Sequence, residues 1–206
     1  MEQKSKKIIS IAIIALIIIA GIVVVSLWGF NKELKYAQSQ RIDILVEQKV
    51  DEAKIKSIAD EVLGMHNIVQ TVEIYEEMVT IRAASISEEQ RNTIVNKIKE
   101  NYEFDQTAET TDINTVPATR FRDMYKQYLA PFIISIVLVA IYMVIRYYKK
   151  GILKVLLKAL LIPAVAELLL LSWMAIVRIQ IGRYTPVFVV LVYVASIWYT
   201  MKEIEK

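Results

Sequence analysis

Long apolar runs alternate with charged segments along this chain, and the clearest run lies near its start. Residues 8–30 carry no charge and read IISIAIIALIIIAGIVVVSLWGF. At a rise of about 1.5 Å per residue this run exceeds a hydrocarbon core of roughly 30 Å. It is longer than the apolar region of a typical signal peptide, and no small-x-small cleavage site follows before Asn31. We therefore predict an uncleaved membrane anchor.

Three further apolar runs are long enough to cross a bilayer. They cover Leu129 to Ile145, Gly151 to Val177 and Tyr184 to Met201. With the short basic and polar segments around them, the chain divides into the following predicted parts: a terminus at 1–7, spans at 8–30, 129–148, 155–177 and 184–201, loops at 149–154 and 178–183, and a second terminus at 202–206.

The basic residues around these runs predict the orientation. Short loops rich in lysine and arginine stay in the cytoplasm. One side of the predicted membrane carries most of them: Lys4, Lys6, Lys7, Arg146, Lys149, Lys150, Lys154, Lys158, Lys202 and Lys206. We therefore expect both termini in the cytoplasm and residues 31–128 on the other side of the membrane. This outer segment contains 18 acidic and 13 basic residues up to position 127.

Two amphipathic helices are predicted in the outer segment. Asp51 can cap the first, and Gly64 ends it. Ser87 and Gln90 have capping-box spacing and open the second. Each helix has one apolar face, made by the following residues: Ile55, Ile58, Ala59, Val62 and Leu63 in the first, and Ile94, Val95, Ile98 and Tyr102 in the second.

Alternating apolar residues predict strands around these helices. A first strand holds Ile42, Ile44 and Val46, and a hairpin follows, with its reversal near Glu76 and Glu77. The hairpin strands carry Val72, Ile74, Val79, Ile81 and Ala83, and residues 104–116 can supply a last edge strand. The predicted order is βαββαβ, a ferredoxin-like α+β domain over residues 31–118, inserted between the first two of four transmembrane helices.

Residues 119–128 connect this domain to the second span. Arg120, Arg122 and Lys126 lie opposite Phe121, Met124, Tyr125 and Tyr128 at helical spacing. One interpretation is a helix lying along the outer membrane interface. The other is the extended start of the second transmembrane helix, which Pro131 disturbs only near its first membrane turn.

The amino-acid composition argues against several kinds of catalytic and metal site. The chain has no cysteine and one histidine, His66, so thiolate zinc sites, thiol nucleophiles and histidine triads are not expected. The net charge of +3 is scattered beside apolar segments, which does not favour nucleic acid as a partner. No paired acids, serine-lysine or histidine-glutamate spacing occurs within the spans. We therefore predict no catalytic, cofactor-binding or metal site.

The element order and several stretches resemble SecF, the smaller partner of SecD in bacterial protein export. RIDILVEQKVDEAKIKSIADEV is similar to the first strand and helix of the SecF outer domain, and SISEEQRNTIVNKIKE to its second helix. The stretch from Asn114 to Pro163 resembles the family's second span, basic loop and third span. The resemblance implies SecD-like and SecY-type partners, contact with a translocating polypeptide, and a place in the bacterial plasma membrane.

The chain also departs from the SecF pattern. KYAQSQ stands where the family has a glycine-rich signature with an aspartate, and apolar residues around Leu161 and Ile162 replace its His-Asp pair. VFVVLVYVASIWYT lacks the family's aspartate in the fourth span, and the sequence stops at Lys206, before a fifth and sixth span. Because a proton relay needs titratable groups across the bilayer, we expect this truncated relative not to conduct protons.

A few residues of the spans are candidates for function. Glu167 is the one acidic residue deep in a span, and such groups are costly and functional by default. We favour an assembly role for it, bonded to a neighbouring helix or to a partner subunit, over a proton-carrying role or a shifted span boundary. Pro163, one turn earlier, is expected to kink the helix. For Arg178 and Arg183 we favour headgroup anchoring over a specific contact.

These observations predict an accessory, non-catalytic subunit of the Sec machinery. It would assist translocation by binding and positioning rather than by its own proton conduction. The alternative is a membrane-anchored interaction or sensor module that serves another system, and an intramembrane enzyme ranks last.

Overall fold

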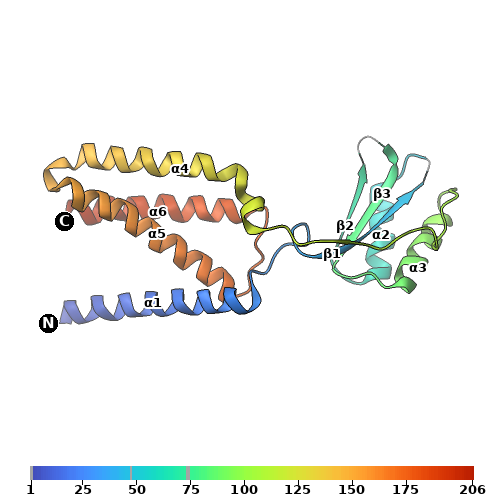
Figure 1. Ribbon diagram of the computed structural model, residues 1–206, viewed down its shortest axis with the longest axis horizontal. Helices are drawn as coiled ribbons and strands as arrows, with labels where there is room; N and C mark the ends of the chain where they lie inside the picture. The colour runs from blue at the N-terminus through green and yellow to red at the C-terminus, as the bar shows by residue number, and fades with distance from the viewer. Residues whose placement is uncertain (1, 47, 73–74) are drawn as a thin grey trace. The chain divides into compact units, whose positions relative to one another are not determined.

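The computed structural model describes residues 2–46, 48–72 and 75–206, which form two compact units (Figure 1). One unit is helical and combines residues 1–32 with 121–206, and the other is an α/β unit over residues 33–120. Each unit has its own apolar core.

The helical unit contains four long helices. These are α1 (Glu2–Trp28), α4 (Phe121–Arg146), α5 (Ile152–Ile176) and α6 (Thr185–Glu205), with the short 3-10 helix η1 (Tyr148–Lys150) between α4 and α5. All four are long and apolar enough to cross a membrane, and the chain is a multi-pass membrane protein with four candidate transmembrane helices.

The helix boundaries differ in places from the predicted ones. Residues 121–128 form the first turns of the continuous helix α4, so the second interpretation of the connecting segment describes its backbone. The predicted loop 149–154 contains η1 and already includes the first turn of α5. Helix α6 extends past residue 201 to Glu205. The predictions followed apolar content, which identifies only the part of a helix that crosses the membrane. The ends of these helices are polar and continue beyond that part.

Helix α5 is central to the helical unit. It packs against α1, α4 and α6, and Figure 1 shows its ribbon running from the side of α4 and α6 towards α1. Near its start Val155 and Ala159 pack with Met143 of α4 and Ile204 of α6 in a small apolar core. Most other apolar side chains of the unit face outwards, as expected of helices whose solvent is lipid.

The α/β unit has the predicted βαββαβ order. Its elements are β1 (Ser39–Leu45), α2 (Glu52–Leu63), β2 (Asn67–Val72), β3 (Tyr75–Ala83), α3 (Glu88–Lys99) and β4 (Asn114–Val116). The strands form one antiparallel sheet in the order β2-β3-β1-β4, which confirms the ferredoxin-like fold class.

The core of this unit lies between the sheet and the two helices. In the central strands Ile42 pairs with Ile81 and Ile44 with Val79, and all four are fully buried. Because side chains alternate along a strand, these residues share one face of the sheet. The apolar faces of α2 and α3 cover that face with the following residues: Ile55, Ile58, Ala59, Leu63, Ile94, Val95 and Ile98.

The predicted helix ends are confirmed in atomic detail. Asp51 caps α2 by accepting a hydrogen bond from the Ala53 amide at 3.0 Å. Gly64 ends α2 with φ of 59°, a left-handed conformation that glycine adopts without a Cβ penalty. Ser87 and Gln90 exchange side-chain and backbone hydrogen bonds at the start of α3, which completes the capping box.

Two details of the strands differ from the prediction. The hairpin forms, but β3 begins at Tyr75, so Glu76 and Glu77 lie in the strand rather than at the reversal; Ile74 lies outside the described residues. The last edge strand covers only Asn114–Val116, because the preceding segment runs as turns and a loop. There, Gln106 donates to the Asp43 carbonyl and accepts from the Leu45 amide at the edge of β1.

Asp60 of α2 makes the stability of the α/β unit dependent on pH. Its carboxylate accepts hydrogen bonds from Lys56 and Asn67, both at 2.8 Å, and these bonds lower the pKa of Asp60 below its ordinary 3.8. A lowered folded-state pKa adds stability above the unfolded-state pKa, and this stability is lost as the pH falls through the folded-state value. We expect Asp60→Asn to lower stability at neutral pH and to match the wild type in strong acid.

The cysteine-free sequence offers a direct measurement of this effect. A single cysteine placed at the fully buried Ala83 reacts with a pyridyl disulfide only when the unit opens. Between pH 5 and pH 2, the protection of this cysteine from the reagent should fall more steeply in the chain with Asp60 than in the Asp60→Asn variant. Equal pH profiles for the two variants would contradict the assignment.

Candidate functional site

Glu167 lies in the middle of α5 with its carboxyl group enclosed by protein. Both carboxyl oxygens are buried, and neither makes a hydrogen bond to any residue that the structure describes. The predicted bond to a serine, tyrosine or carbonyl of a neighbouring helix is therefore not found among those residues. A buried carboxyl without a hydrogen bond costs about 1–3 kcal/mol, and more when it is charged, which makes Glu167 the most unusual polar residue of the helical unit.

The packing of α5 against α6 gives the height of Glu167. The Lys158 ammonium donates to the Glu203 carbonyl at 2.9 Å, which aligns the two antiparallel helices. Nine residues further along α5, about 14 Å at helical rise, lies Glu167, and the same step along α6 reaches Val194. The neighbouring Tyr193 is buried and packs on Phe132 of α4, with ring centroids 5.1 Å apart. Glu167 is far from both ends of α5, which runs from Ile152 to Ile176.

Pro163 lies one turn before Glu167 on the buried side of α5. Its ring is buried, and the helix continues through it from Ile152 to Ile176. Proline has no amide hydrogen, so the Ala159 carbonyl one turn earlier loses its usual helical partner. Val155, Ala159 and Pro163 form a buried stripe that leads along the helix towards Glu167.

Arg178 makes a specific contact with the end of α1, the alternative that the sequence analysis set beside headgroup anchoring. Its guanidinium donates to the Gly29 carbonyl at 2.8 Å, and its own carbonyl accepts from the Asn31 side chain at 2.7 Å. The Ile181 amide also donates to the Asn31 carbonyl. Arg178 adopts φ of 59°, unusual for a residue with a side chain. These bonds join the end of α1 to the segment after α5. Arg183 lies in the same segment and is exposed.

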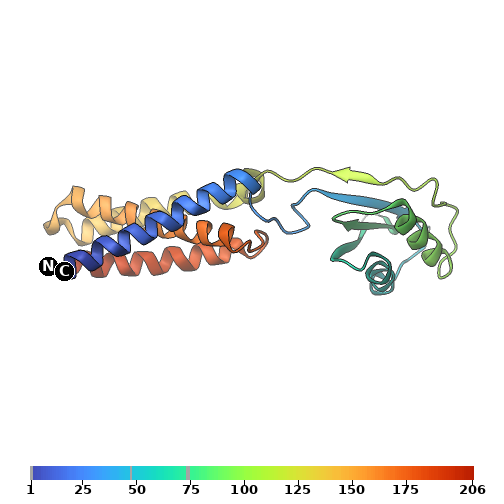
Figure 2. The same cartoon turned by 90° about the horizontal axis from the view of Figure 1, so that it is seen from below.

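Gly21 allows the close contact between α1 and α5, and the sequence analysis did not single it out. The crossing of the two helices is visible in Figure 2. A Cβ built on Gly21 would lie 2.3 Å from the Ser172 Cβ and 2.5 Å from its Cα. Only glycine fits at such a distance, and small residues are the usual means by which membrane helices approach closely. The sequence signal was present, because the first run contains only two glycines, and Gly21 is the one that lies away from its end.

The predicted basic residues of the connecting segment are divided between the two units. Arg120 ends the α/β unit, whereas Arg122 and Lys126 lie on α4, and all three are exposed. Arg122 forms an ion pair with the adjacent Asp123 at 3.5 Å. Of the apolar residues predicted opposite the basic ones, Met124 is buried, whereas Phe121 and Tyr128 are exposed.

These observations define the class of protein: a multi-pass membrane protein with four candidate transmembrane helices and an α/β domain between the first and second. Within the described ranges no three histidine, cysteine, aspartate or glutamate side chains gather as a metal ion requires. A comparison with protein-family models and with curated proteins finds no match to this chain. The fold and Glu167 are therefore the features of this chain that bear on its function.

Proposed function

We propose that this chain is a SecF-like accessory subunit of the Sec export machinery. The observation that carries the proposal is the ferredoxin-like domain inserted directly after the first membrane helix. It is the arrangement that the resemblance to SecF implies, together with similar sequence in both domain helices. In this proposal the membrane is the bacterial plasma membrane, the termini are cytoplasmic and the α/β unit lies outside.

The α/β unit supports a role in binding extended polypeptide. Strand β2 is an edge of the sheet and pairs only with β3 in the sheet as described. Its sequence, NIVQTV, has no charge and no proline, the devices that usually protect an edge. An extended chain can add to such an edge through main-chain hydrogen bonds, which read no sequence and so suit varied clients.

The membrane helices support positioning rather than proton conduction. Away from their ends, the four candidate spans contain one acidic residue, Glu167, and no histidine. A single carboxyl cannot pass a proton along side chains, because each relay step needs a second titratable group within reach. We propose instead that Glu167 meets a hydrogen-bond donor on a helix of a SecD-like or SecY-type partner, where the bond would offset the cost of burial.

In-membrane crosslinking tests the proposed function. A photoreactive amino acid replaces Gln70, an exposed residue of β2, in the full chain within its native membrane. We expect crosslinks to a SecD-like or SecY-type protein and to exported polypeptides in transit, with the latter lost when export is blocked. The matched control places the same group at Glu89, exposed on α3.

Two results would contradict the proposal. One is recovery of the chain alone, together with normal export after its depletion. The other is capture of a kinase or transporter from Gln70, which would favour the alternative of a sensor or interaction module.

A further inference from the structure

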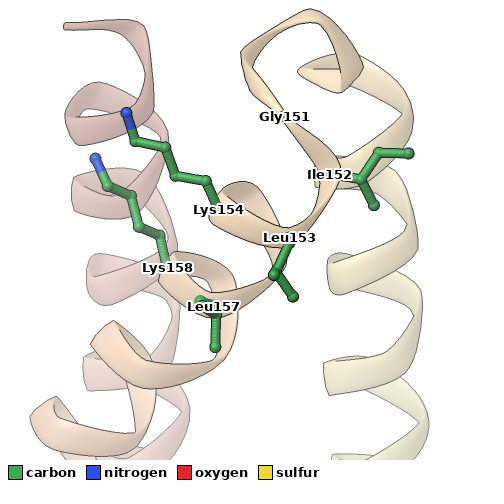
Figure 3. Close-up of a pocket in the computed structure, with 6 residues that line it drawn as sticks. All are labelled: Gly151, Ile152, Leu153, Lys154, Leu157 and Lys158. Carbon is green, nitrogen blue, oxygen red and sulfur yellow. The ribbon is translucent and has the colours of Figure 1, made fainter.

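Four lysines gather where the turn after α4 meets the end of α6. Lys150, Lys154 and Lys158 line one small polar pocket of about 100 Å³ together with Glu203 and Lys206. Lys154 and Lys158 also line a neighbouring, open apolar hollow of about 600 Å³. In Figure 3 their side chains extend from α5 in the same direction, towards the faint red ribbon of α6.

Three of these lysines have a partner within the unit, and Lys206 is one of them through its ion pair with Glu203. Lys158 donates to the Glu203 carbonyl at 2.9 Å and Lys150 to the Glu205 carbonyl at 3.2 Å, so both cap the carboxyl end of α6. Lys154 makes no hydrogen bond or ion pair with any described residue. It lies one helical turn before Lys158, and like charges at this spacing repel each other. The carboxylate of Glu203 lines the same pocket but forms an ion pair with Lys206 at 3.4 Å. A further anion between Lys154 and Lys158 would offset their mutual repulsion.

The apolar hollow beside the lysines indicates what kind of molecule carries the anion. Its walls are Ile152, Leu153 and Leu157, which are 59%, 70% and 49% exposed. In Figure 3 Leu153 and Leu157 lie on a different side of α5 from the ammonium groups. The hollow is at the end of three candidate spans, the level at which phospholipid headgroups join their acyl chains. A free phosphate ion would use the lysines and leave the hollow empty.

We propose that this place is a binding site for an anionic phospholipid. The headgroup phosphate lies between Lys154 and Lys158, and the first carbons of an acyl chain lie against Leu153 and Leu157. Basic pockets between membrane helices bind acidic lipid headgroups by the same combination of charge and apolar contact. The site is independent of the proposed role in export, because none of its residues belongs to β2 or to the surroundings of Glu167.

Native mass spectrometry of the purified full chain tests the proposal, with phosphatidylglycerol as the probe and phosphatidylcholine as the neutral reference. We expect retained phosphatidylglycerol and an affinity loss of about tenfold or more in K154Q/K158Q, since each lysine near a headgroup contributes about 1 kcal/mol. The matched control is K149Q/K202Q, which removes the same charge at the same end of the unit. Lys149 and Lys202 lie over the rings of Tyr148 and Trp198, outside both pockets.

Each remaining outcome has a definite meaning. Equal losses in the two double variants would overturn the proposal, since general attraction to a basic surface predicts that result. Displacement of the lipid by inorganic phosphate would also overturn it, because the site would then recognise the anion alone. A second variant, L153Q/L157Q, keeps every charge; it should weaken phosphatidylglycerol binding without altering the weak binding of inorganic phosphate. Melting temperatures of all variants identify any that fail to fold.

Discussion

Replacing Gly21 with valine should separate α1 from α5 and destabilise the helical unit. Even the Cβ of the new side chain would lie 2.3 Å from the Ser172 Cβ and 2.5 Å from its Cα, so no rotamer relieves the clash. The backbone of one helix must move, which costs about 1–3 kcal/mol for ordinary overpacking and more when the obstacle is a main chain. We expect a lower midpoint in titrations of the folded chain with SDS, followed by tryptophan fluorescence.

Ala15→Val is the matched control for this experiment. Ala15 lies on the same helix and is exposed, so an added side chain should extend into lipid with little effect. Gly21→Ala combined with Ser172→Gly should recover part of the loss, because it removes the serine side chain from the crossing while the main chain of α5 still obstructs the new methyl group. An unchanged midpoint in Gly21→Val would show that α1 does not depend on this crossing.

The α/β domain was predictable because its signals are local. The Asp51 cap, the Gly64 stop and the capping box of Ser87 and Gln90 each act within four residues. The spacing of apolar residues then identifies the buried face of each helix and strand, because an element of a water-exposed domain buries only one face. The position of the hairpin reversal was predicted wrongly, because Glu76 and Glu77 are charged residues on an alternating strand and have no turn-forming chemistry.

The packing of the membrane helices was not predictable in the same way. Lipid is as apolar as leucine, so the side of a helix that faces lipid does not differ in hydropathy from the side that faces protein. The contacts that matter therefore come from residues without a strong hydropathy signal. Gly21 acts through its size, and the Arg178 contact with Gly29 joins positions 149 residues apart.

Glu167 was identifiable from sequence, since a carboxyl deep in an apolar run stands out by charge alone. Its surroundings were not identifiable. The predicted bonding within the chain requires a donor on a neighbouring helix at the right height and rotation. The nearby hydroxyls of α6 are already committed, with Ser196 donating to the Tyr193 carbonyl and Thr200 to the Ser196 carbonyl. In a helix, such side chains readily bond their own backbone one turn earlier.

Replacing Glu167 with leucine should have opposite effects on the isolated chain and on its proposed complex. In the isolated chain the change removes a buried carboxyl without a hydrogen bond, so the SDS midpoint should rise, by about 1–3 kcal/mol in unfolding free energy. In the native membrane the same change removes the proposed bond to a partner helix, so recovery of the partner with the chain should fall. Glu167→Gln keeps a donor and an acceptor and should retain most of the partner.

The two readouts distinguish the possible roles of this carboxyl. Leu168→Ala is the control for a substitution at a neighbouring position of α5, because Leu168 is 48% exposed. It should change neither the SDS midpoint nor the recovery of the partner. A lower SDS midpoint in Glu167→Leu would mean that the carboxyl already stabilises the chain by itself. A higher midpoint with full partner recovery would remove its role in assembly. An assembly role for Glu167 is supported only if Glu167→Leu makes the isolated chain more stable and also weakens its association with the partner. A buried carboxyl that destabilises its own fold is retained where a partner protein supplies its hydrogen bond.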